Sequence, residues 1–468
     1  MSRIRHPLAA VAATALLTLP WVGVFSVGLH HDLAPGVVVA ISGAAVLGAS
    51  FMLAWGAETA EKDVPRAFAI AVLAVLAVAP EYAVDALFAF NAGDGGATTQ
   101  ACATLSREAI EAAAEGGGST LAAACHDANL AIANMTGANR ILIGLGWSGI
   151  ALFTIYKSRT TADPAVRDRA GALADAVSID RDISLEIAFL FLATAWAFFV
   201  PLGGGIDLLD TFVLVGLYVA YIGVVLRGDV EEVEDQVGVP AYFHEKARRV
   251  RIPAAIALFL YSGVMIFIAV EPFAHGLEEL GRNLGVPSFF MIQWIAPLAS
   301  ESPELIVVVY LVNKARSTAG FNALISSKLN QWTLLIGTIA VVYSIGLGTY
   351  GALPFDAKQS AEIWITAAQS FFALSILVNY EISVREAITL LVLFVSQVVI
   401  EFLILQVFAV ANPEGLSRAV LIGYAVVYVL LGIALFARRR GAFRELFGRT
   451  RNVVREAAGK EPIAEWAD

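Results

Sequence analysis

The sequence predicts an all-α polytopic membrane protein with about 12 transmembrane helices. Of the 468 residues, 58% are hydrophobic and only 15% are charged, whereas about a quarter of the residues in a soluble protein are charged. The apolar residues gather in runs of about 20, which is the length that a helix needs to cross a bilayer. Lysine and arginine concentrate in every second link between these runs, as the positive-inside rule requires.

The first half of the chain contains six of these runs. They cover about residues 8–29, 36–57, 65–90, 129–156, 183–201 and 206–226. The first run is long for a signal-peptide core and is not followed by a small-residue cleavage sequence, which favours a retained helix over a cleaved signal peptide. A polar insertion at 91–128 separates the third and fourth spans. The glycines at 203–205 suit a tight hairpin between spans five and six.

The second half contains six more runs and a basic tail. The runs cover about residues 253–272, 286–311, 323–350, 359–379, 386–410 and 417–437, and the tail begins at Arg438. The central hydrophilic loop at 227–252 carries an acidic stretch at 229–235. Because this stretch lacks the spacing and the glycine of an EF-hand, a solvated helix is favoured over a calcium site.

The distribution of basic residues predicts the orientation. With the N-terminus in the cytoplasm, the links that contain most of the lysine and arginine lie on the cytoplasmic side, namely 58–66, 157–182, 227–252, 312–322 and the tail. We therefore expect a multi-pass protein of the plasma (inner) membrane with both termini in the cytoplasm. Spans three and eight then cross the bilayer in opposite directions, as an inverted repeat requires.

Spans three and eight carry acidic residues and a proline in their interiors. Span three contains Pro80, Glu81 and Asp85, and span eight contains Glu301, Pro303 and Glu304, with Ser300 just before them. A charge at bilayer depth is costly, so it marks a functional site by default, and a proline interrupts the helix beside it. Carboxylates and freed carbonyl groups together form an oxygen-rich site that suits a hard cation.

The spans that follow share a second polar pattern. Residues 134–146 and 323–337 each contain amide side chains and one basic residue. Interrupted apolar segments at corresponding places in the two halves of a chain point to the binding site of a secondary transporter. The duplication makes this evidence stronger than a single Pro-Glu pair in one helix.

These stretches resemble the alpha-repeats of the calcium/cation antiporter superfamily, the sodium/calcium exchanger family, of which the chain looks like a divergent prokaryotic-type member. The family pattern is roughly Gly-Thr-Ser-x-Pro-Glu in one helix and Gly-Asn-x-x-Gly-Ser-Asn in the next. The matching residues are Pro80, Glu81, Ser300, Pro303, Glu304, Asn134, Gly137 and Asn139. The resemblance implies an inverted-repeat antiporter core of ten helices, spans two to eleven, with one extra helix at each end.

The resemblance also divides the chain into segments. They are an extra N-terminal helix at 1–35, a first inverted repeat at 36–226 with its outer insertion at 91–128, a cytoplasmic loop at 227–252, a second inverted repeat at 253–410, and an extra C-terminal helix with the basic tail at 411–468.

The implied function is a secondary active antiporter that exchanges calcium or a similar cation against protons and/or sodium by alternating access. Glu81 and Glu304, one from each repeat, would bind the transported cation. Further ligands would be Asp85, Ser300, Glu301, Asn134, Asn139, Ser327 and Gln331. The alternatives are that the acids pair with basic residues to hold helices together, and that the amides form ordinary interhelical hydrogen bonds.

The chain departs from the family pattern at several hydroxyl and amide positions. Ala77 and Val78 replace the threonine and serine that precede the first proline, Ala138 replaces a serine, and Leu142 replaces a polar residue. The missing hydroxyl and amide groups would be sodium ligands, so the departures leave the identity of the exchanged ions open.

Arg140 and Lys328 follow Ala138 and Ser327 at corresponding places in the two repeats, and we expect them to be fixed counter-charges. The four acids of the expected site carry a formal charge of −4, which two permanent cations reduce to −2, enough for one divalent ion. Because a buried carboxylate takes up a proton more readily than an exposed one, we expect protons to drive exchange at least as well as sodium. Alternatively, one of the two basic side chains extends to the membrane interface and does not meet the site.

Two further residue pairs carry expectations. Cys102 and Cys125 are expected to form a disulfide, since the predicted topology places both outside the cell, where disulfides persist; the alternative is two free buried thiols. Gln397 and Glu401 lie one turn apart in span eleven and are interpreted as packing residues rather than as an ion path.

Other classes of function have less support. The net charge of −10 gives no basic surface for nucleic acid, and the six histidines lie near the edges of apolar runs or outside them, which argues against a buried haem or zinc. We expect no enzymatic activity and no cofactor. The expected partners are the lipid bilayer and inorganic cations, and the oligomeric state stays open. A cation channel that uses the same carboxylates is the main alternative, and a membrane scaffold is a weaker one.

Overall fold

A computed structural model describes residues 6–60, 62–63, 79–114, 118–227 and 238–463. Among these residues, ten helices are long and apolar enough to cross a bilayer, and the broken pair Ser288–Ser302 and Glu304–Asn313 passes the same test as one further span. The all-α polytopic membrane fold is therefore confirmed. The third expected span is described only from α5 (Ala79–Asp94) onward, and its first part lies outside the described residues.

The described helices before residue 228 are α1 (Pro7–Ser26), α2 (Pro35–Ala60), α5, α6 (Thr99–Ala103), α7 (Arg107–Ala114), α8 (Thr120–Ile141), α9 (Ser148–Ser158), α10 (Ser184–Ala197) and α11 (Leu208–Val225). Those after residue 237 are α12 (Val239–His244), α13 (Arg248–Leu284), α14 (Ser288–Phe290), α15 (Ala296–Asn313), α16 (Ser317–Asn330), α17 (Ile336–Leu347), α18 (Ala357–Leu377), α19 (Val384–Gln406), α20 (Pro413–Arg438) and α21 (Arg440–Ala457).

Two spans are longer than the sequence predicted. The fourth begins at Thr120 rather than near 129, because the Ser119 hydroxyl caps the helix by accepting from the Ala122 amide at 3.2 Å. The seventh runs over Arg248–Leu284 and continues through Pro272 until Gly285, whose φ of 69° ends it. The expected insertion and central loop are correspondingly shorter, and the acidic stretch at 229–235 lies outside the described residues.

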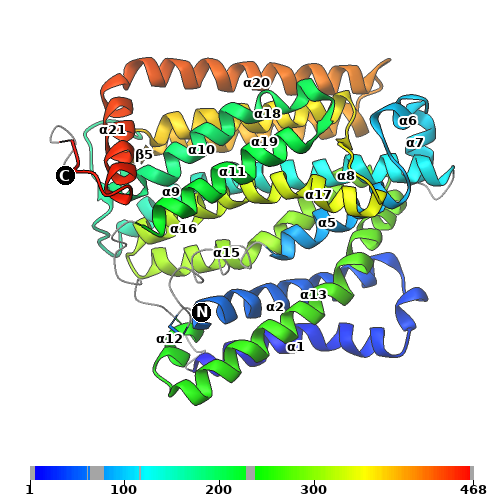
Figure 1. The fold of residues 1–468 in the computed structure, drawn as a ribbon, viewed down its shortest axis with the longest axis horizontal. Helices are drawn as coiled ribbons and strands as arrows, with labels where there is room; N and C mark the ends of the chain where they lie inside the picture. The colour runs from blue at the N-terminus through cyan, green and yellow to red at the C-terminus, as the bar shows by residue number, and fades with distance from the viewer. Residues whose placement is uncertain (1–5, 61, 64–78, 115–117, 228–237, 464–468) are drawn as a thin grey trace. The chain divides into compact units, whose positions relative to one another are not determined.

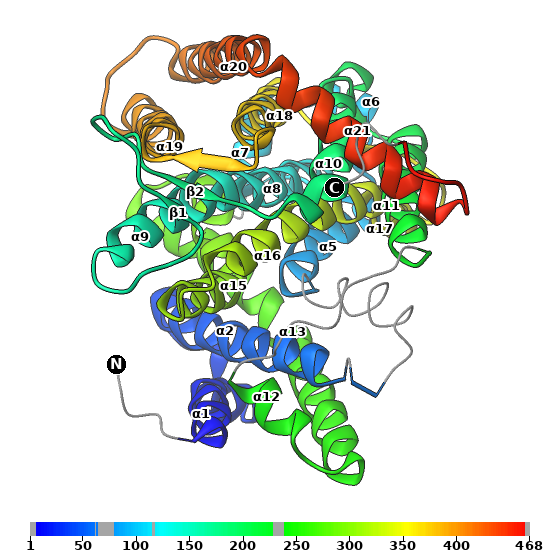
Figure 2. The ribbon, with the colours of Figure 1, turned by 90° about the vertical axis from the view of Figure 1, so that its left-hand side faces the viewer.

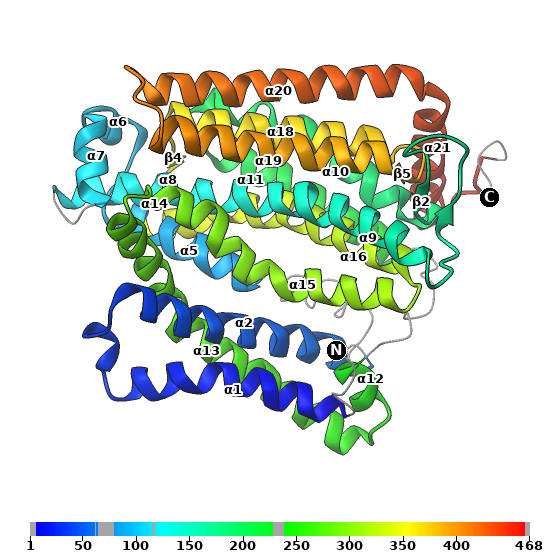
Figure 3. The same ribbon diagram turned by 180° about the vertical axis from the view of Figure 1, so that it is seen from behind.

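The chain forms two compact units, and each takes part of both expected repeats. Unit 1 contains residues 1–87 and 229–303, and unit 2 contains residues 88–228 and 304–468. In unit 1, α1, α2 and α13 lie side by side (Figure 3). Glycines allow this packing, since a Cβ atom at Gly43 would lie 2.9 Å from the ring of Phe273.

An ion pair lies beyond the end of α2. Arg251 donates from Nε and Nη2 to the two carboxylate oxygens of Asp63 at 2.6 and 2.7 Å. These hydrogen bonds hold the pKa of Asp63 below its usual range.

The long helices of unit 2 run lengthwise beside one another (Figure 1). The most deeply buried is α18, which packs against α8, α10 and α20. At one end of these helices, a small antiparallel sheet joins β1 (Val166–Arg167) and β2 (Ala176–Ser178) to β5 (Glu381–Ser383), as Figure 2 shows. A second strand pair joins β3 (Gly205–Ile206) to β4 (Leu353–Pro354). Both sheets connect the first half of the chain to the second half.

Two helical segments of unit 2 repeat the same irregularity. A π turn at Leu142–Trp147 separates α8 from α9, and a π turn at Gln331–Leu335 separates α16 from α17. These turns overlap the two polar stretches, 134–146 and 323–337, that the sequence analysis paired. A π turn inserts one extra residue into the helix and is frequent at functional sites. The matching interruptions support an internal duplication.

The predicted disulfide is confirmed, because Cys102 of α6 is bonded to Cys125 of α8 across a sequence separation of 23.

Close packing of α5 on α17 depends on one glycine in each helix. A Cβ atom at Gly93 would overlap the carbonyl oxygen of Tyr343, and one at Gly346 would overlap that of Phe90. The two helices can cross at this distance only because both positions are glycine.

Candidate functional site

The acidic residues of the expected site in unit 1 are deeply buried. The residue exposures are 1% for Glu81, 0% for Asp85 and 3% for Glu301. Glu81 and Asp85 are four residues apart on α5, so their side chains share one helix face. Ser300 is half-buried on α15, and its hydroxyl donates to the carbonyl oxygen of Pro297 at 3.3 Å. Carboxylates buried at this depth are retained in membrane helices for function rather than for solubility.

The remaining expected ligands belong to unit 2. Glu304 is partly buried on α15, in the turn after the proline of that helix. Asn134 and Asn139 are buried on α8, and Gln331 is buried at the start of the π turn after α16. The Gln331 amide donates to the hydroxyl of half-buried Ser327 at 3.5 Å. The structure thus places every expected ligand of this unit on α8, α15 or the α16–α17 segment.

Lys328 joins the two polar stretches of unit 2 directly. Its ammonium group donates to the side-chain oxygen of Asn139 at 2.6 Å and to the Asn139 carbonyl oxygen at 3.3 Å. It also lies 4.2 Å from the ring centre of Trp332, a cation–π contact. Asn139 in turn donates to the carbonyl oxygen of Met135 at 2.8 Å. The ammonium group of Lys328 on α16 is therefore hydrogen-bonded to the side-chain oxygen of Asn139 on α8.

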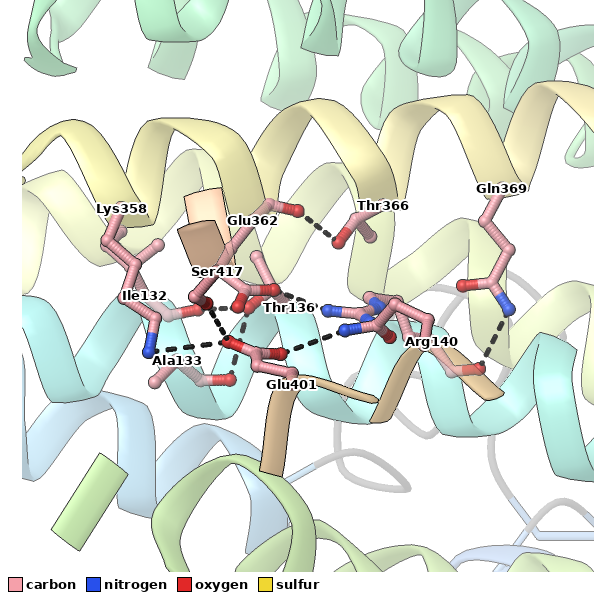
Figure 4. A network of polar contacts seen from close by, with 11 residues as sticks. Ile132, Ala133, Thr136, Arg140, Lys358, Glu362, Thr366, Gln369, Glu401 and Ser417 are labelled. Atoms are coloured by element: carbon pink, nitrogen blue, oxygen red, sulfur yellow. Dashed lines mark hydrogen bonds and ion pairs between the residues drawn. The ribbon is translucent and has the colours of Figure 1, made fainter. Parts of the chain in front are cut away.

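Arg140 has different surroundings from Lys328. Its guanidinium forms an ion pair with Glu362 of α18 and donates to the side-chain oxygen of Gln397 on α19. The Gln369 amide donates to the Arg140 carbonyl oxygen at 3.4 Å. The side-chain exposures of Arg140 and Glu362 are 1% and 0%. Figure 4 shows this contact in the interior between α8 and α18.

The same network continues toward α20. The Gln397 amide donates to Glu401 at 2.8 Å, the Ser417 hydroxyl of α20 donates to Glu401 at 3.1 Å, and the Lys358 ammonium lies 3.4 Å from Glu401. Two acids and two bases therefore share one buried region, and their formal charges cancel. A network whose charges cancel has no net charge with which to attract a divalent cation.

The corresponding placement of Arg140 and Lys328 needs correction. Lys328 follows Ser327 directly, whereas Arg140 is the second residue after Ala138. Lys328 meets the amide of the opposite repeat, and Arg140 meets Glu362.

Sequence reasoning assigned no role to Glu362 or Lys358. It interpreted Gln397 and Glu401 as packing residues, and the structure gives them specific polar partners. The available signal was a count of charges. A buried arginine in the fourth span requires a buried acid, and Glu362 and Glu401 are acids in the interiors of later spans.

Comparison with known proteins agrees with this architecture. The family model described as "Sodium/calcium exchanger protein" matches residues 35–227 and 254–403. The crystal structure of the H⁺/Ca²⁺ exchanger CAX is similar at 40% sequence identity and a TM-score of 0.78, covering 97% of this chain and 99% of that chain. The structure of the Ca²⁺/H⁺ antiporter YfkE shares the fold at 13% identity and a TM-score of 0.54, covering 90% and 100% of the two chains. No curated protein sequence matched the chain.

The family match covers most of the chain, including both polar stretches and the two acid-bearing helices. It confirms the resemblance drawn from the repeated Pro-Glu motifs. The chain therefore belongs to the sodium/calcium exchanger family of membrane proteins.

Proposed function

We propose that the protein is a secondary active antiporter that exchanges calcium for protons across the plasma membrane by alternating access. The observation that carries the proposal is the deep burial of Glu81, Asp85 and Glu301 on the two helices whose sequences combine proline and acid. The 40% identity to an H⁺/Ca²⁺ exchanger over 97% of this chain supports the same choice of ions. In this proposal both termini lie in the cytoplasm, as the positive-inside pattern predicts.

Glu81 and Glu304 are the proposed calcium ligands, one from each repeat. Two carboxylates that release two protons and bind one calcium ion keep the same total charge. The calcium-bound site and the protonated site therefore carry the same charge. The change between inward-facing and outward-facing conformations then has a similar electrostatic cost in both directions of exchange. Asp85, Ser300 and Glu301 lie on the same helices and are proposed to complete the oxygen shell.

The contact between Lys328 and Asn139 favours protons over sodium. A sodium ion needs neutral oxygen ligands, and the side-chain oxygen of Asn139 accepts from the Lys328 ammonium at 2.6 Å. Lys328 is covalently tethered and buried, so it holds the place of a monovalent cation without being transported. We propose that this fixed charge removes one sodium-binding oxygen. The proposed role of Arg140 as a second fixed charge is weaker, because Glu362 neutralises it.

The proposal is tested by radioactive calcium uptake into proteoliposomes, with pH and sodium gradients imposed separately. We expect uptake under a pH gradient in sodium-free buffer. Glu81→Gln and Glu304→Gln should each abolish uptake while the protein stays folded, since each removes a negative oxygen ligand from the proposed cation site. Glu381→Gln, which removes an acid of the small sheet, is the matched control and should transport normally.

Two outcomes contradict the proposal. Wild-type-like transport by either glutamate variant would show that the site assignment is wrong. Calcium flux that requires neither a pH gradient nor a sodium gradient and is driven by membrane voltage alone would indicate a channel. Lys328→Ala provides a separate test of the ion choice: we expect this variant to gain sodium-driven uptake, and an unchanged ion preference would rule out the fixed-charge argument.

A further inference from the structure

The helix α21 at the end of the chain has an arginine-rich face that no described residue covers. Arg440, Arg444 and Arg451 are all exposed on this helix. At about 100° per residue, these three side chains fall within about 40° of one another around the helix axis. The ion pairs of α21 among the described residues join Glu445 to Arg449 and to Arg181, and none of them includes these three arginines. We refer to Arg440, Arg444 and Arg451 as the arginine face.

An apolar edge lies next to the arginine face. Phe443, Phe447 and Val454 follow one another along the helix within about 40°, directly beside the three arginines. Val454 is 39% exposed. The centres of the two phenylalanine rings lie 4.5 Å apart with the rings tilted, and the rings contact Phe436 of α20 and Phe191 of α10. A basic stripe beside a partly exposed apolar edge is the pattern of a helix that lies in a membrane interface.

The position of α21 is fixed relative to the last membrane helix. α20 has 26 residues, about 39 Å of helix, which exceeds the ~30 Å hydrocarbon core of a bilayer. α21 begins directly after α20 and turns sharply away from its axis (Figure 1). Arg439 holds the corner by donating to the Ile376 carbonyl oxygen at 2.6 Å and pairing with Glu386. Because α20 is longer than the hydrocarbon core, its end and the arginine face that follows it fall at the edge of the core rather than inside it.

The helix is also docked on the membrane bundle. It packs against α10 and α11, and Figure 2 shows it crossing the ends of those helices. Leu446 and Thr450 are buried on its inner side, and the Thr450 hydroxyl donates to the Ser184 carbonyl oxygen at 3.0 Å. The inner side and the two phenylalanine rings already contact protein, whereas the arginine face and Val454 beside it are exposed and can meet another molecule.

We propose that the arginine face binds the phosphate groups of anionic phospholipids in the leaflet next to α21. The charge is complementary, since this face carries three positive charges and the phosphate group of an anionic phospholipid is negative. Arginine suits the task because its planar guanidinium binds phosphate oxygens in pairs. Each basic residue held at a bilayer surface strengthens binding to anionic lipid by about fivefold, so the three together provide about 100-fold.

Lipid retention by the purified full-length chain tests this proposal. The protein is exchanged into micelles that contain equal amounts of phosphatidylglycerol and phosphatidylcholine, and bound lipids are counted by native mass spectrometry. We expect the wild type to retain phosphatidylglycerol preferentially. The variant R440Q/R444Q/R451Q should lose most of that preference and keep its thermal unfolding midpoint.

A matched control removes the same charge elsewhere. The variant R159Q/R167Q/R249Q changes three other exposed arginines and should keep the lipid preference of the wild type. Equal loss in both variants would show a general charge effect and overturn the proposal, as would unchanged retention in the first variant. Inorganic phosphate at the same micelle composition separates the possible ligands: if it displaces the lipid fully, the face is a site for free phosphate and the proposal is wrong.

Discussion

Replacing Glu362 by glutamine removes the negative charge that faces Arg140 in the interior of unit 2. Both side chains are almost fully buried, with exposures of 1% and 0%. Removing one partner of a buried ion pair leaves the other charge without compensation, which typically costs about 3–5 kcal/mol. We therefore expect Glu362→Gln to lower the free energy of unfolding by about 4 kcal/mol, even though the glutamine has nearly the same volume.

Removing both charges should cost much less. In the double variant R140M/E362L the interior keeps its volume and loses both desolvated charges, an exchange that is often neutral or stabilising. One cost remains, because the side-chain oxygen of Gln397 loses the guanidinium as its donor. An unsatisfied buried acceptor costs about 1–3 kcal/mol, so the double variant should lie between the wild type and Glu362→Gln.

The measurement is the unfolding of the purified protein in detergent, for the wild type, Glu362→Gln, the single variants R140M and E362L, and the double variant. Glu381→Gln is the control, because Glu381 pairs with Arg169, whose side chain is 46% exposed, and an exposed pair contributes about 1 kcal/mol or less. If Glu362→Gln costs no more than Glu381→Gln, or if the two single effects simply add in the double variant, the buried pair is not the stabilising contact that we describe.

Three further changes test other parts of the structure. Asp63→Asn should destabilise the protein at neutral pH and have little effect in acid, because a depressed pKa adds stability above the usual value of 3.8 that is lost as pH falls through the depressed pKa; a pH series of unfolding checks it. Replacing Cys102 and Cys125 by alanine should lower the free energy of unfolding by about 3 kcal/mol. A wild-type unfolding midpoint that does not fall under reducing conditions would contradict this. Gly346→Ala should cost about 1–3 kcal/mol because the new methyl group overlaps the backbone of α5, whereas Gly423→Ala, which meets no atom within 4 Å, should be neutral or stabilising in the same assay.

The membrane spans were largely predictable because each depends on residues that are close in sequence. A run of about 20 apolar residues is a membrane helix regardless of its neighbours. The repeated Pro-Glu motif predicted the family for the same reason, and the family model now shows it. The disulfide between Cys102 and Cys125 followed from the predicted topology, and the structure contains it.

The ends of helices were less predictable because packing competes with local preference. Span seven was expected to end near residue 272, yet α13 continues through Pro272 to Leu284. A proline inside a helix costs about 3 kcal/mol, and the long contact between α13 and α2 offsets that cost. Local signals alone do not contain this contact.

The partners of buried charges could not be predicted at all from local patterns. Arg140 was expected to be a counter-charge of the ion site, and the structure shows it in an ion pair with Glu362, which the sequence analysis did not name. The two residues are separated by 222 positions, so no periodicity links them. The assignment of Glu81 and Glu304 to one site is of the same kind, and it stays a prediction until the variants are measured.

The separation between Arg140 and Glu362 has a consequence for biosynthesis. Ribosomes add about 5–20 residues per second, so α8 enters the membrane about 10–45 s before α18 has been made. During that interval Arg140 lies in a membrane helix without its acid, at an insertion cost of about 2.5–3.5 kcal/mol. The first half of the chain therefore completes its interior only after most of the second half has emerged. A chain truncated before α18 should hold α8 loosely and be exposed to the proteases of membrane quality control.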